Sequence, residues 1–253
     1  MIELVDEGAT PRRQRAPQRE LRLLHASDCH LGLSSRMSPN EDAFVALIDL
    51  AAAEAVDALV IAGDLFDTPR ADLPALEWTA AQLDRLACPA VILPGNHDIY
   101  GEQSVFTTMD FERRCANVHV LDEPGGELVC LTELDAAFFG RAVHDHAPSF
   151  RPMADVPPRP DAGWCVLIGH GLVLDSEEPS GRGSPIYRSE LAAIDWDYVA
   201  LGHVATYQVV QAEPVPVVYA GNTARSHGGR PGAVLVEMIP DAGVTATWTA
   251  LGD

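Results

Sequence analysis

The sequence contains no lysine, and arginine accounts for all 17 of its basic residues. With 37 acidic residues, the formal net charge is −20 at pH 7. A protein that coats nucleic acid by charge alone needs clustered Lys and Arg against the phosphates, so this composition argues against that class. It leaves room for an enzyme that acts on nucleic acid, because bound divalent ions would supply positive charge locally. We attribute the missing lysine to a compositional bias of the genome.

Signals for export, disulfide bonds and membrane insertion are missing too. The five cysteines are scattered and form no Cys-x-x-Cys pair, a pattern typical of free thiols in a reducing compartment. Residues 1–20 lack the apolar core of a signal peptide. The longest apolar stretch, residues 44–62, is interrupted by Asp49, Glu54 and Asp57, which excludes a transmembrane helix. We therefore predict a cytoplasmic protein that does not associate with membranes.

What is present has the composition of an ordinary globular protein. The 253 residues, 47% of them hydrophobic, are enough for one large α/β domain or two small ones. Residues 1–19 show no periodicity and are predicted to form a flexible N-terminal tail. Residues 20–253 show no internal repeat and no clear linker, so we predict a single domain there.

The first hundred residues alternate between strand and helix patterns. Apolar runs predict strands at 21–26, 57–62 and 90–93. Helical spacing predicts two helices between them, the first capped by Asn40 and the second spanning 73–86. Such β-α-β crossovers predict parallel strands joined by right-handed connections.

The second half consists mainly of short strand patterns. Strands are predicted at 117–121, 127–132, 136–139, 164–168, 198–201, 207–211, 215–220, 233–239 and 244–250. Gly125-Gly126 predicts a hairpin turn, residues 189–194 a short helix, and the last four strands an antiparallel set. Together the elements predict two mixed sheets with helices outside.

Polar side chains follow five of the apolar strands at the point where each strand ends. The fullest example is Leu93-Pro94-Gly95-Asn96-His97-Asp98, where a glycine turn presents an amide, an imidazole and a carboxylate. Asp or His closes the other four strands in the same way, in segments 26–30, 62–67, 168–170 and 201–203. Functional groups in open α/β sheets gather at the carboxyl ends of strands, so we expect these side chains to meet.

The strand ends supply six candidate metal ligands, which are Asp28, His30, Asp64, Asn96, His170 and His203. Mixed imidazole and carboxylate ligation suits Mn, Fe or Zn rather than Ca or Mg. Six ligands exceed the needs of one tetrahedral zinc, so two ions that share a bridging carboxylate fit better. Ions paired ~3.5–4 Å apart are the usual device for hydrolysing phosphate esters, because they bind phosphoryl oxygens and generate a hydroxide nucleophile near neutral pH.

The motifs Asp-x-His, Gly-Asp-x-x-Asp, Gly-Asn-His-Asp, Gly-His and Gly-His stand in this order between about Leu21 and Ile239. They resemble those of the calcineurin-like metallophosphoesterase family, and five ordered motifs at strand ends rarely coincide by chance. Within that family the likeness is greatest to the nuclease subunits of bacterial DNA-repair complexes, the SbcD type. It is carried by residues 24–32, 197–203 and 219–225, the last together with the later strand 232–238. The resemblance implies an α/β fold, a four-layer α/β/β/α sandwich.

The resemblance also implies a role for each ligand position: Asp28 and His30 on a first divalent ion, Asp64 as the bridge, and Asn96, His170 and His203 on a second. His97 would be the catalytic general acid, donating a proton to the leaving alkoxide or stabilising the charged transition state. Asp67 would accept a hydrogen bond from a metal-bound His or water. Mn²⁺ is the favoured metal for both positions, with Fe and Zn as alternatives.

The chain departs from the family pattern once. The family's last motif is usually Gly-His-x-His, and its second His is a ligand of the first ion. Here the sequence is Gly202-His203-Val204-Ala205, and an alanine cannot coordinate. We therefore expect the first metal site to be weakened, with His227 as a candidate replacement ligand.

Two functions remain open on the sequence alone. One is a nuclease-like phosphodiester hydrolase, and the other is a scaffold of the same fold that binds partners with weak or no activity. His97 and the six ligand positions favour the enzyme, while Ala205 favours the scaffold. The related nucleases carry a DNA-capping domain, which we do not expect here. With a charge of −20, the candidate substrates are short DNA, short RNA or nucleotides, with a protein partner or a homodimer as options.

Several other residues have simpler interpretations than catalysis. His25 is expected to pack in the core, and His144 is expected to be exposed in a loop. The Cys29 side chain should point away from the ligands on either side of it. Asp98 would either orient His97 or cap the next turn, and Arg188 would either contact phosphate or be solvated.

Overall fold

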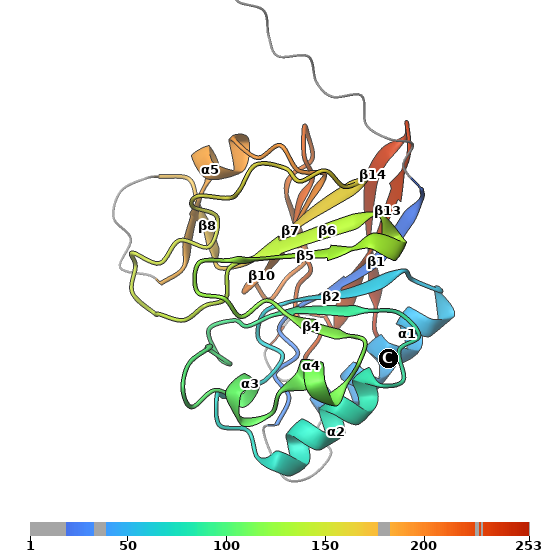
Figure 1. Ribbon diagram of the computed structural model, residues 1–253, viewed down its shortest axis with the longest axis vertical. Coiled ribbons are helices and arrows are strands. Elements are labelled where there is room, and N and C mark those ends of the chain that lie inside the picture. Colours follow the sequence, from blue (N-terminus) through green and yellow to red (C-terminus); the bar gives the residue numbers. More distant parts are fainter. Residues whose placement is uncertain (1–18, 33–38, 177–182, 226–227, 229, 253) are drawn as a thin grey trace, which may run out of the picture.

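The computed structural model of the protein describes residues 19–252, apart from residues 33–38, 177–182, 226–227 and 229. Two six-stranded sheets lie face to face, with helices α1 to α4 outside the first sheet and α5 outside the second (Figure 1). This arrangement confirms the predicted α/β/β/α order. The layer outside the second sheet has little helix, because α5 spans only five residues and connecting segments cover the rest of that face.

The first sheet has the strand order β14-β13-β1-β2-β3-β4. Its strands are β1 Leu21–Ala26, β2 Ala58–Ala62, β3 Ala90–Leu93, β4 Val118–Val120, β13 Gly232–Ile239 and β14 Gly243–Ala250. The first four run parallel, as the crossover pattern predicts, while β13 is antiparallel to β1 and β14 to β13. Every residue of β2 is buried, as expected for an unbroken apolar run in a parallel sheet.

The second sheet has the order β11-β12-β10-β7-β6-β5. Its strands are β5 Glu127–Leu131, β6 Ala136–Gly140, β7 Trp164–His170, β10 Tyr198–Gly202, β11 Gln208–Gln211 and β12 Val217–Tyr219. The central strands β6, β7, β10 and β12 are parallel, and the edge strands β5 and β11 are antiparallel to their neighbours. A separate parallel pair is formed by β8 Leu172–Leu174 and β9 Pro185–Tyr187.

The helices are short apart from the first two. They are α1 Pro39–Ala53, α2 Leu73–Leu83, α3 Val105–Thr108, α4 Phe111–Arg114, the 3-10 turn η1 Thr132–Leu134, and α5 Arg188–Ala192. The carboxylate of Asp72 caps α2 by accepting a hydrogen bond from the Ala75 amide. In the part of the chain that the structure describes, no helix is long and apolar enough to cross a membrane.

Three apolar layers hold the elements together. Phe44, Leu47 and Leu76 belong to the layer between the helices and the first sheet. Val60, Phe138 and Val218 belong to the layer between the two sheets, and Leu167 and Trp196 to the layer outside the second sheet. The buried apolar residues of α1, which include Phe44, Leu47, Ile48 and Ala51, recur at helical spacing and form one face of the helix.

Three predictions about local structure are wrong. Asn40 lies inside α1 and does not cap it, because its side chain instead donates to the His30 carbonyl. Gly125-Gly126 is not a hairpin turn, since β4 pairs with β3 and β5 pairs with β6 in the other sheet. The last four strands do not form one antiparallel set. The pair β11 and β12 joins the second sheet, with β12 parallel to β10, and the pair β13 and β14 joins the first.

Candidate metal centre

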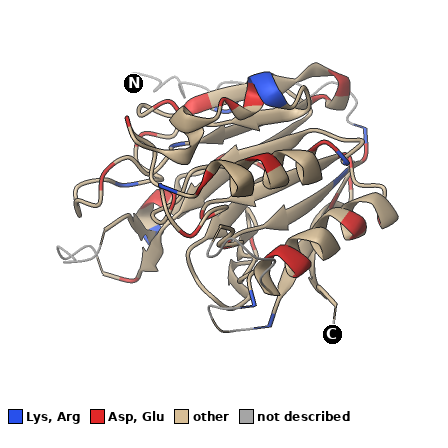
Figure 2. Ribbon diagram, turned by 90° about the horizontal axis from the view of Figure 1, so that it is seen from below, with Lys and Arg blue, Asp and Glu red and all other residues tan. Residues whose placement is uncertain are grey.

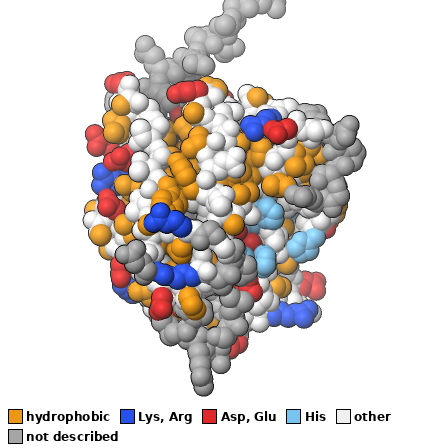
Figure 3. All heavy atoms as spheres, turned by 180° about the vertical axis from the view of Figure 1, so that it is seen from behind, with side chains coloured by type: hydrophobic (Ala, Val, Ile, Leu, Met, Phe, Trp, Pro, Cys, Tyr) orange, Lys and Arg blue, Asp and Glu red, His pale blue; other side chains and the backbone are white. Residues whose placement is uncertain are grey.

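The five strand ends that carry the motifs meet at one edge of the sandwich. Strands β1, β2 and β3 are parallel neighbours in the first sheet, and β7 and β10 are parallel neighbours in the second. Their carboxyl ends therefore lie on the same side within each sheet. Ligand atoms from both sheets contact one another across this edge, as the distances below show. Figure 3 shows histidine side chains gathered beside acidic ones on one part of the surface.

Four of the six predicted ligands converge on one point. Nε2 of His170 lies 2.9 Å from Asn96 Oδ1 and 3.2 Å from Asp64 Oδ2. Nδ1 of His203 lies 2.8 Å from the same Asn96 oxygen. The other ring nitrogen of His170 faces the Ala62 carbonyl at 2.8 Å, so Nδ1 carries the hydrogen and Nε2 is left to coordinate.

The other two predicted ligands lie beside this group. His30 Nε2 is 3.9 Å from Asp28 Oδ1, and the second Asp28 oxygen accepts a hydrogen bond from the His203 amide at 3.0 Å. His30 Nδ1 lies 3.1 Å from Asp67 Oδ1. Asp67 therefore sits behind a predicted ligand, in the place the resemblance implies for it.

Like the exposed His203, His97 is accessible to solvent. Its side chain is 38% exposed, while those of His30 and His170 are 4% and 0% exposed. Its Nδ1 lies 3.1 Å from the backbone carbonyl of Asp67, and its amide donates to Asp64 Oδ1 at 2.8 Å. The ring packs edge-on against His30, with 4.6 Å between the ring centroids. His97 is thus fixed at the open side of the centre.

Neither of the two roles considered for Asp98 is what the structure shows. Its carboxylate accepts hydrogen bonds from the amides of Gly95 at 2.7 Å and Phe66 at 3.0 Å. This buried side chain ties the loop after β3 to the loop after β2. Cys29 points away from the ligands, as expected, and packs in the layer under α1.

Four of the nine described non-glycine residues with positive φ are predicted ligands of this centre. Positive φ angles occur at Asp28, with 54°, at His30, with 48°, and at Asp64, with 54°. His203 has a φ of 96°. Such conformations cost about 1–3 kcal/mol each and persist only where the surroundings determine them. Here the surroundings are hydrogen bonds between strand ends, such as the Asp28 amide to the Gly63 carbonyl at 3.0 Å. Four strained residues among six predicted ligands point to a functional requirement for this geometry.

Two glycines make room for the ligands. A Cβ on Gly63 would lie 2.0 Å from His170 Nδ1, and the residue has a φ of +91°, so both space and conformation require glycine. A Cβ on Gly95 would lie 2.2 Å from Asp64 Oδ1. The glycines in these motifs therefore act by letting the backbone approach the ligand side chains closely.

The electrostatics of the centre favour bound positive charge. Burial by itself would lower the pKa of His170, but attraction to Asp64 and Asp28 raises it to about 10. Burial raises the pKa of Asp28 to about 6, although His170 opposes the rise. In the protein alone, the buried carboxylates thus hold a proton on His170 that a divalent cation would displace. The donor set and its charge fit a metal ion.

The ligand atoms form two sets that share Asp64. The atoms of Asp28, Asp64 and His170 lie within 4.8 Å of one another, and so do those of His30, Asp64 and His97. A shared Asp64 agrees with the bridging role implied by the resemblance. The presence of His97 in the second set had not been expected.

Residues that the sequence analysis did not single out support the centre from outside. The Thr223 amide donates to the Ser27 carbonyl and the Ala224 amide to the Asp28 carbonyl, each at 3.0 Å. The Tyr219 hydroxyl accepts from the Val173 amide and donates to the Gly171 carbonyl, each at 2.8 Å. The sequence assigns no function to segment 219–225 beyond its contribution to the resemblance. In the structure, this segment holds the loops that follow β1 and β7.

The remaining candidates are placed as follows. Ala205 lies two residues after His203, and its carbonyl accepts from the Asn222 amide at 3.2 Å. His227 falls outside the described residues. Arg188 forms an ion pair with Asp175, which its exposed position allows, and this agrees with the solvated alternative. His144 is exposed, as expected.

A family model described as calcineurin-like phosphoesterase matches residues 21–207. The match covers more than half of the chain, so the chain belongs to the calcineurin-like phosphoesterase family, a family of hydrolases that includes nucleases. The resemblance derived from the ordered motifs is thereby confirmed.

Two curated relatives are nucleases or repair proteins. The chain is 32% identical over 238 residues to the DNA double-strand break repair protein Mre11 of Haloferax volcanii, covering 87% of this chain and 50% of that protein. It is 28% identical over 273 residues to the SbcD component of the nuclease SbcCD of Bacillus subtilis, covering 90% and 68%. The chain spans about half the length of several curated relatives that it matches.

Solved structures share the fold at low sequence identity. An archaeal phosphodiesterase superposes with a TM-score of 0.52 at 14% identity, covering 91% of this chain and 100% of that one. At this identity the likeness concerns the fold alone.

Proposed function

We propose that the protein is a metal-dependent phosphodiester hydrolase of the nuclease-like type. The observation that carries this proposal is the meeting of carboxylate and imidazole groups around Asp64, with the partly exposed His97 among them. Family membership supports a phosphoesterase, and the strained, glycine-cradled geometry supports a site maintained for chemistry.

Asp28, His30 and Asp64 would hold a first divalent ion, and Asp64, Asn96, His170 and His203 a second. Mn²⁺ is the favoured metal, with Fe and Zn as alternatives, because the donor set mixes imidazoles with carboxylates. Two such ions, when bound, supply Lewis acidity toward the phosphoryl oxygens and a nucleophile near neutral pH. Ala205 would leave the first ion with fewer protein ligands than the second.

His97 would serve as the general acid. Because its Nδ1 faces the Asp67 carbonyl, which can only accept a hydrogen bond, that nitrogen carries a hydrogen. Nε2 is then the nitrogen that would hold the proton taken by the leaving alkoxide. The partial exposure of the ring allows a substrate to reach it.

The substrates would be short DNA, short RNA or nucleotides. Relatives include a DNA double-strand break repair protein and a nuclease component, which favours a nucleic-acid phosphodiester. Figure 2 shows a few basic residues scattered among more numerous acidic ones, in agreement with the charge of −20. Binding of long DNA would therefore need a protein partner or a homodimer. The tail predicted over 1–19 lies outside the described residues except for residue 19. A single domain over 20–253 and a cytoplasmic location remain predictions.

The second candidate function is a binding scaffold with weak or no turnover. Ala205 favours it, because the loss of one ligand is a step toward loss of metal. Metal analysis of the purified protein, with a panel of phosphodiesters and phosphomonoesters, separates the two functions. An enzyme binds metal and turns over a diester, whereas a scaffold hydrolyses none of the panel at saturating Mn²⁺.

The sharper test is the variant His97→Ala. We expect turnover of an unactivated phosphodiester, such as a dinucleotide, to fall by roughly 10²–10⁴-fold while metal content stays the same. An activated aryl ester is a poor substrate for this test, because its leaving group needs little protonation. The exposed His146 offers a matched control, and His146→Ala should keep full activity.

Unchanged turnover in His97→Ala would remove the residue from the mechanism. Loss of metal together with activity would contradict a purely acid role. It would instead make His97 a ligand together with His30 and Asp64, whose ligand atoms lie within 4.8 Å of it.

A further inference from the structure

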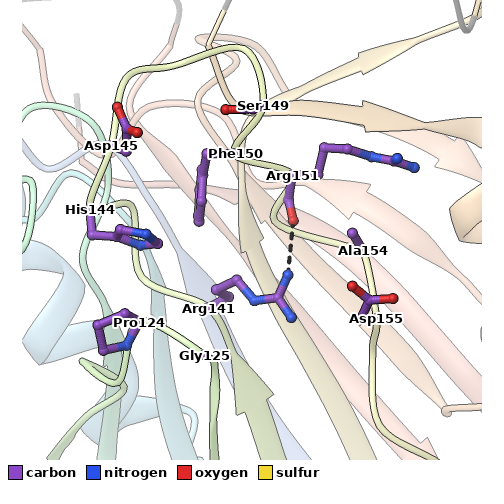
Figure 4. A pocket seen from close by; sticks show the side chains of 10 residues that line it. All are labelled: Pro124, Gly125, Arg141, His144, Asp145, Ser149, Phe150, Arg151, Ala154 and Asp155. Carbon is purple, nitrogen blue, oxygen red and sulfur yellow. Dashed lines mark hydrogen bonds between the residues drawn. The ribbon is translucent and has the colours of Figure 1, made fainter.

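A polar pocket outside the candidate metal centre is not used by the proposed chemistry. Its volume is about 450 Å³, within the range of small-molecule sites. One wall comes from the turn at Pro124 and Gly125, and the rest from the connection between β6 and β7. The side chains of Arg141, His144, Phe150 and Asp155 surround the space (Figure 4).

The pocket is attached to the loop that carries Asn96 and His97. The Val143 amide donates to the Pro94 carbonyl at 3.2 Å, and the Tyr100 amide donates to the Val143 carbonyl at 2.9 Å. These two hydrogen bonds join Val143 to both ends of the segment 94–100. Arg141 directly follows β6, whose last residue pairs with Ile168 of β7, two residues before His170. The pocket therefore opens at the same edge of the sheets as the metal centre.

Arg141 brings hydrogen-bond donors to this pocket that the other described residues leave available. Among the described residues it forms no ion pair, and its one hydrogen bond runs from Nη1 to the Arg151 carbonyl at 3.3 Å. Its Nε is buried without a hydrogen-bond partner. Arg151, in contrast, is neutralised by Glu190 at 2.8 Å, and its side chain runs away from the pocket (Figure 4).

The opposite wall is aromatic. His144 packs edge-on against Phe150, with 4.9 Å between the ring centroids and 79° between the planes. Nδ1 of His144 lies 3.2 Å from the Ala142 carbonyl, so its Nε2 is left for a ligand. A flat ring entering the pocket would meet aromatic surface on one side and the guanidinium on the other.

The charges of the pocket decide which part of a nucleic-acid substrate fits. Asp145 and Asp155 line it together with Arg141, and a phosphate would meet both carboxylates. A neutral heterocycle can accept hydrogen bonds from the guanidinium through its carbonyls and donate to a carboxylate through its N–H groups. We propose that this pocket binds the nucleobase of the nucleoside attached to the scissile phosphodiester, an inference that rests on the proposed hydrolase function.

The test compares two esters with the same scissile bond. Thymidine 5′-p-nitrophenyl phosphate carries a base with carbonyls and a ring N–H, while methyl p-nitrophenyl phosphate carries none. We expect kcat/KM of the wild type to be about 10–100-fold higher for the thymidine ester, the scale of one good bidentate contact to a base. Arg141→Ala and Asp155→Asn should each reduce this preference to less than about threefold and leave hydrolysis of the methyl ester unchanged.

A matched control removes an arginine elsewhere. Arg85 lies on the helical side and pairs with Asp49, so Arg85→Ala should keep the full preference. Thermal unfolding of each variant checks that the fold is retained. Binding of free thymidine to the metal-free protein, followed by NMR, should be saturable in the wild type and lost in Arg141→Ala, which tests the pocket without activity.

Equal kcat/KM values for the two esters in the wild type would overturn the nucleobase pocket. A preference retained by both Arg141→Ala and Asp155→Asn would overturn it as well. If neither ester is hydrolysed with Mn²⁺ present, the proposed hydrolase function is wrong. The nucleobase pocket is then tested by the binding of free thymidine, and loss of saturable binding in the wild type would overturn it.

Discussion

Single residues decide how tightly each metal position can bind. In the proposed centre, Ala205 stands where the family usually has a histidine ligand of the first ion, while Asn96, His170 and His203 would all hold the second. Replacing a ligand by water weakens a site, because a preformed donor is lost and the ion keeps fewer protein contacts. The absence of this one histidine therefore predicts two metal sites of unequal affinity in one centre.

We predict that the second ion is retained on purification and that the first needs added metal. Ala205→His should tighten the first site by ~10–100-fold, the usual scale for losing or restoring a supporting ligand. Titration with Mn²⁺ measures both sites. Thr206→His serves as the control, because this exposed residue directly follows Ala205.

Two equally tight sites in the wild type would refute this prediction and indicate a substitute ligand. His97 is one candidate, since it already lies beside His30 and Asp64. His227 remains the other candidate from the sequence.

His25 predicts how stability depends on pH. It is fully buried in β1, with Nδ1 3.0 Å from the Tyr198 hydroxyl, and burial lowers its pKa to about 3. The unfolded chain binds a proton at this histidine below pH ~6.5, and the folded protein does so only near its lowered pKa. The stability contributed by neutral His25 is therefore complete above pH ~6.5 and is lost as the pH falls toward 3.

We expect His25→Gln to flatten this loss. Between pH 7 and 4.5, the free energy of unfolding should fall by about 2–3 kcal/mol more in the wild type than in the variant. The size follows because each unit of pKa difference between the folded and unfolded states corresponds to 1.36 kcal/mol. Urea unfolding at the two pH values measures the difference. His146→Gln should behave like the wild type, because that side chain is exposed. Parallel losses in His25→Gln and the wild type would contradict the argument.

At the scale of elements, the centre depends on close approach between strand ends. The loop after β3 passes so near Asp64 that a Cβ on Gly95 would lie 2.2 Å from Oδ1 and 2.5 Å from the Asp64 backbone nitrogen. Real Cβ atoms do not come this close, so a larger residue must displace the bridging carboxylate or the loop.

We predict that Gly95→Ala lowers the affinity for Mn²⁺ by at least ~10-fold. Gly101→Ala is the matched control from the same loop, because a Cβ there would meet nothing within 4 Å. Metal titration compares the two variants, with thermal unfolding as a check on folding. Equal and undiminished affinities in both would show that the loop moves aside without cost to the centre.

The elements also show what a local pattern can predict. Strands β1, β2 and β3 fall within one residue of their predicted ends, because an apolar run between turn residues defines a buried strand locally. The partner of a strand is not local information. Residues 125–126 resemble a hairpin turn in sequence, yet the strands beside them pack in different sheets.

On the scale of the whole molecule, the candidate metal centre joins the two sheets. Asp28, Asp64 and Asn96 follow strands of the first sheet, while His170 and His203 come from strands of the second. An ion bound by both groups stabilises the packing of one sheet on the other, because it binds the folded protein and not the separated ligands.

We predict that Mn²⁺ raises the midpoint of thermal unfolding and that a chelator lowers it. At a metal concentration of 100 times Kd the stabilisation is ~2.7 kcal/mol, which corresponds to about 5–10 °C for a chain of this size. His170→Ala should show little of this shift. A midpoint that does not change with Mn²⁺ in the wild type would exclude a tight metal site across the sheets.

The sequence by itself determined the family, the five strand-end motifs and the identity of the six candidate ligands. These features are local, since each consists of an apolar strand, a glycine and the polar residues that follow. The ordering of parallel strands then implied that the motifs would meet, because the carboxyl ends of parallel strands share one edge.

Only the tertiary structure decided the features that depend on contacts between distant segments. These include the bonds of Asp98 to two loops, the placement of His97 in a ligand set with His30, and the pocket around Arg141. The pairing of β11 to β14 with two different sheets belongs here as well. Such contacts follow from how sheets and loops pack in three dimensions, and spacing along the chain carries no information about them.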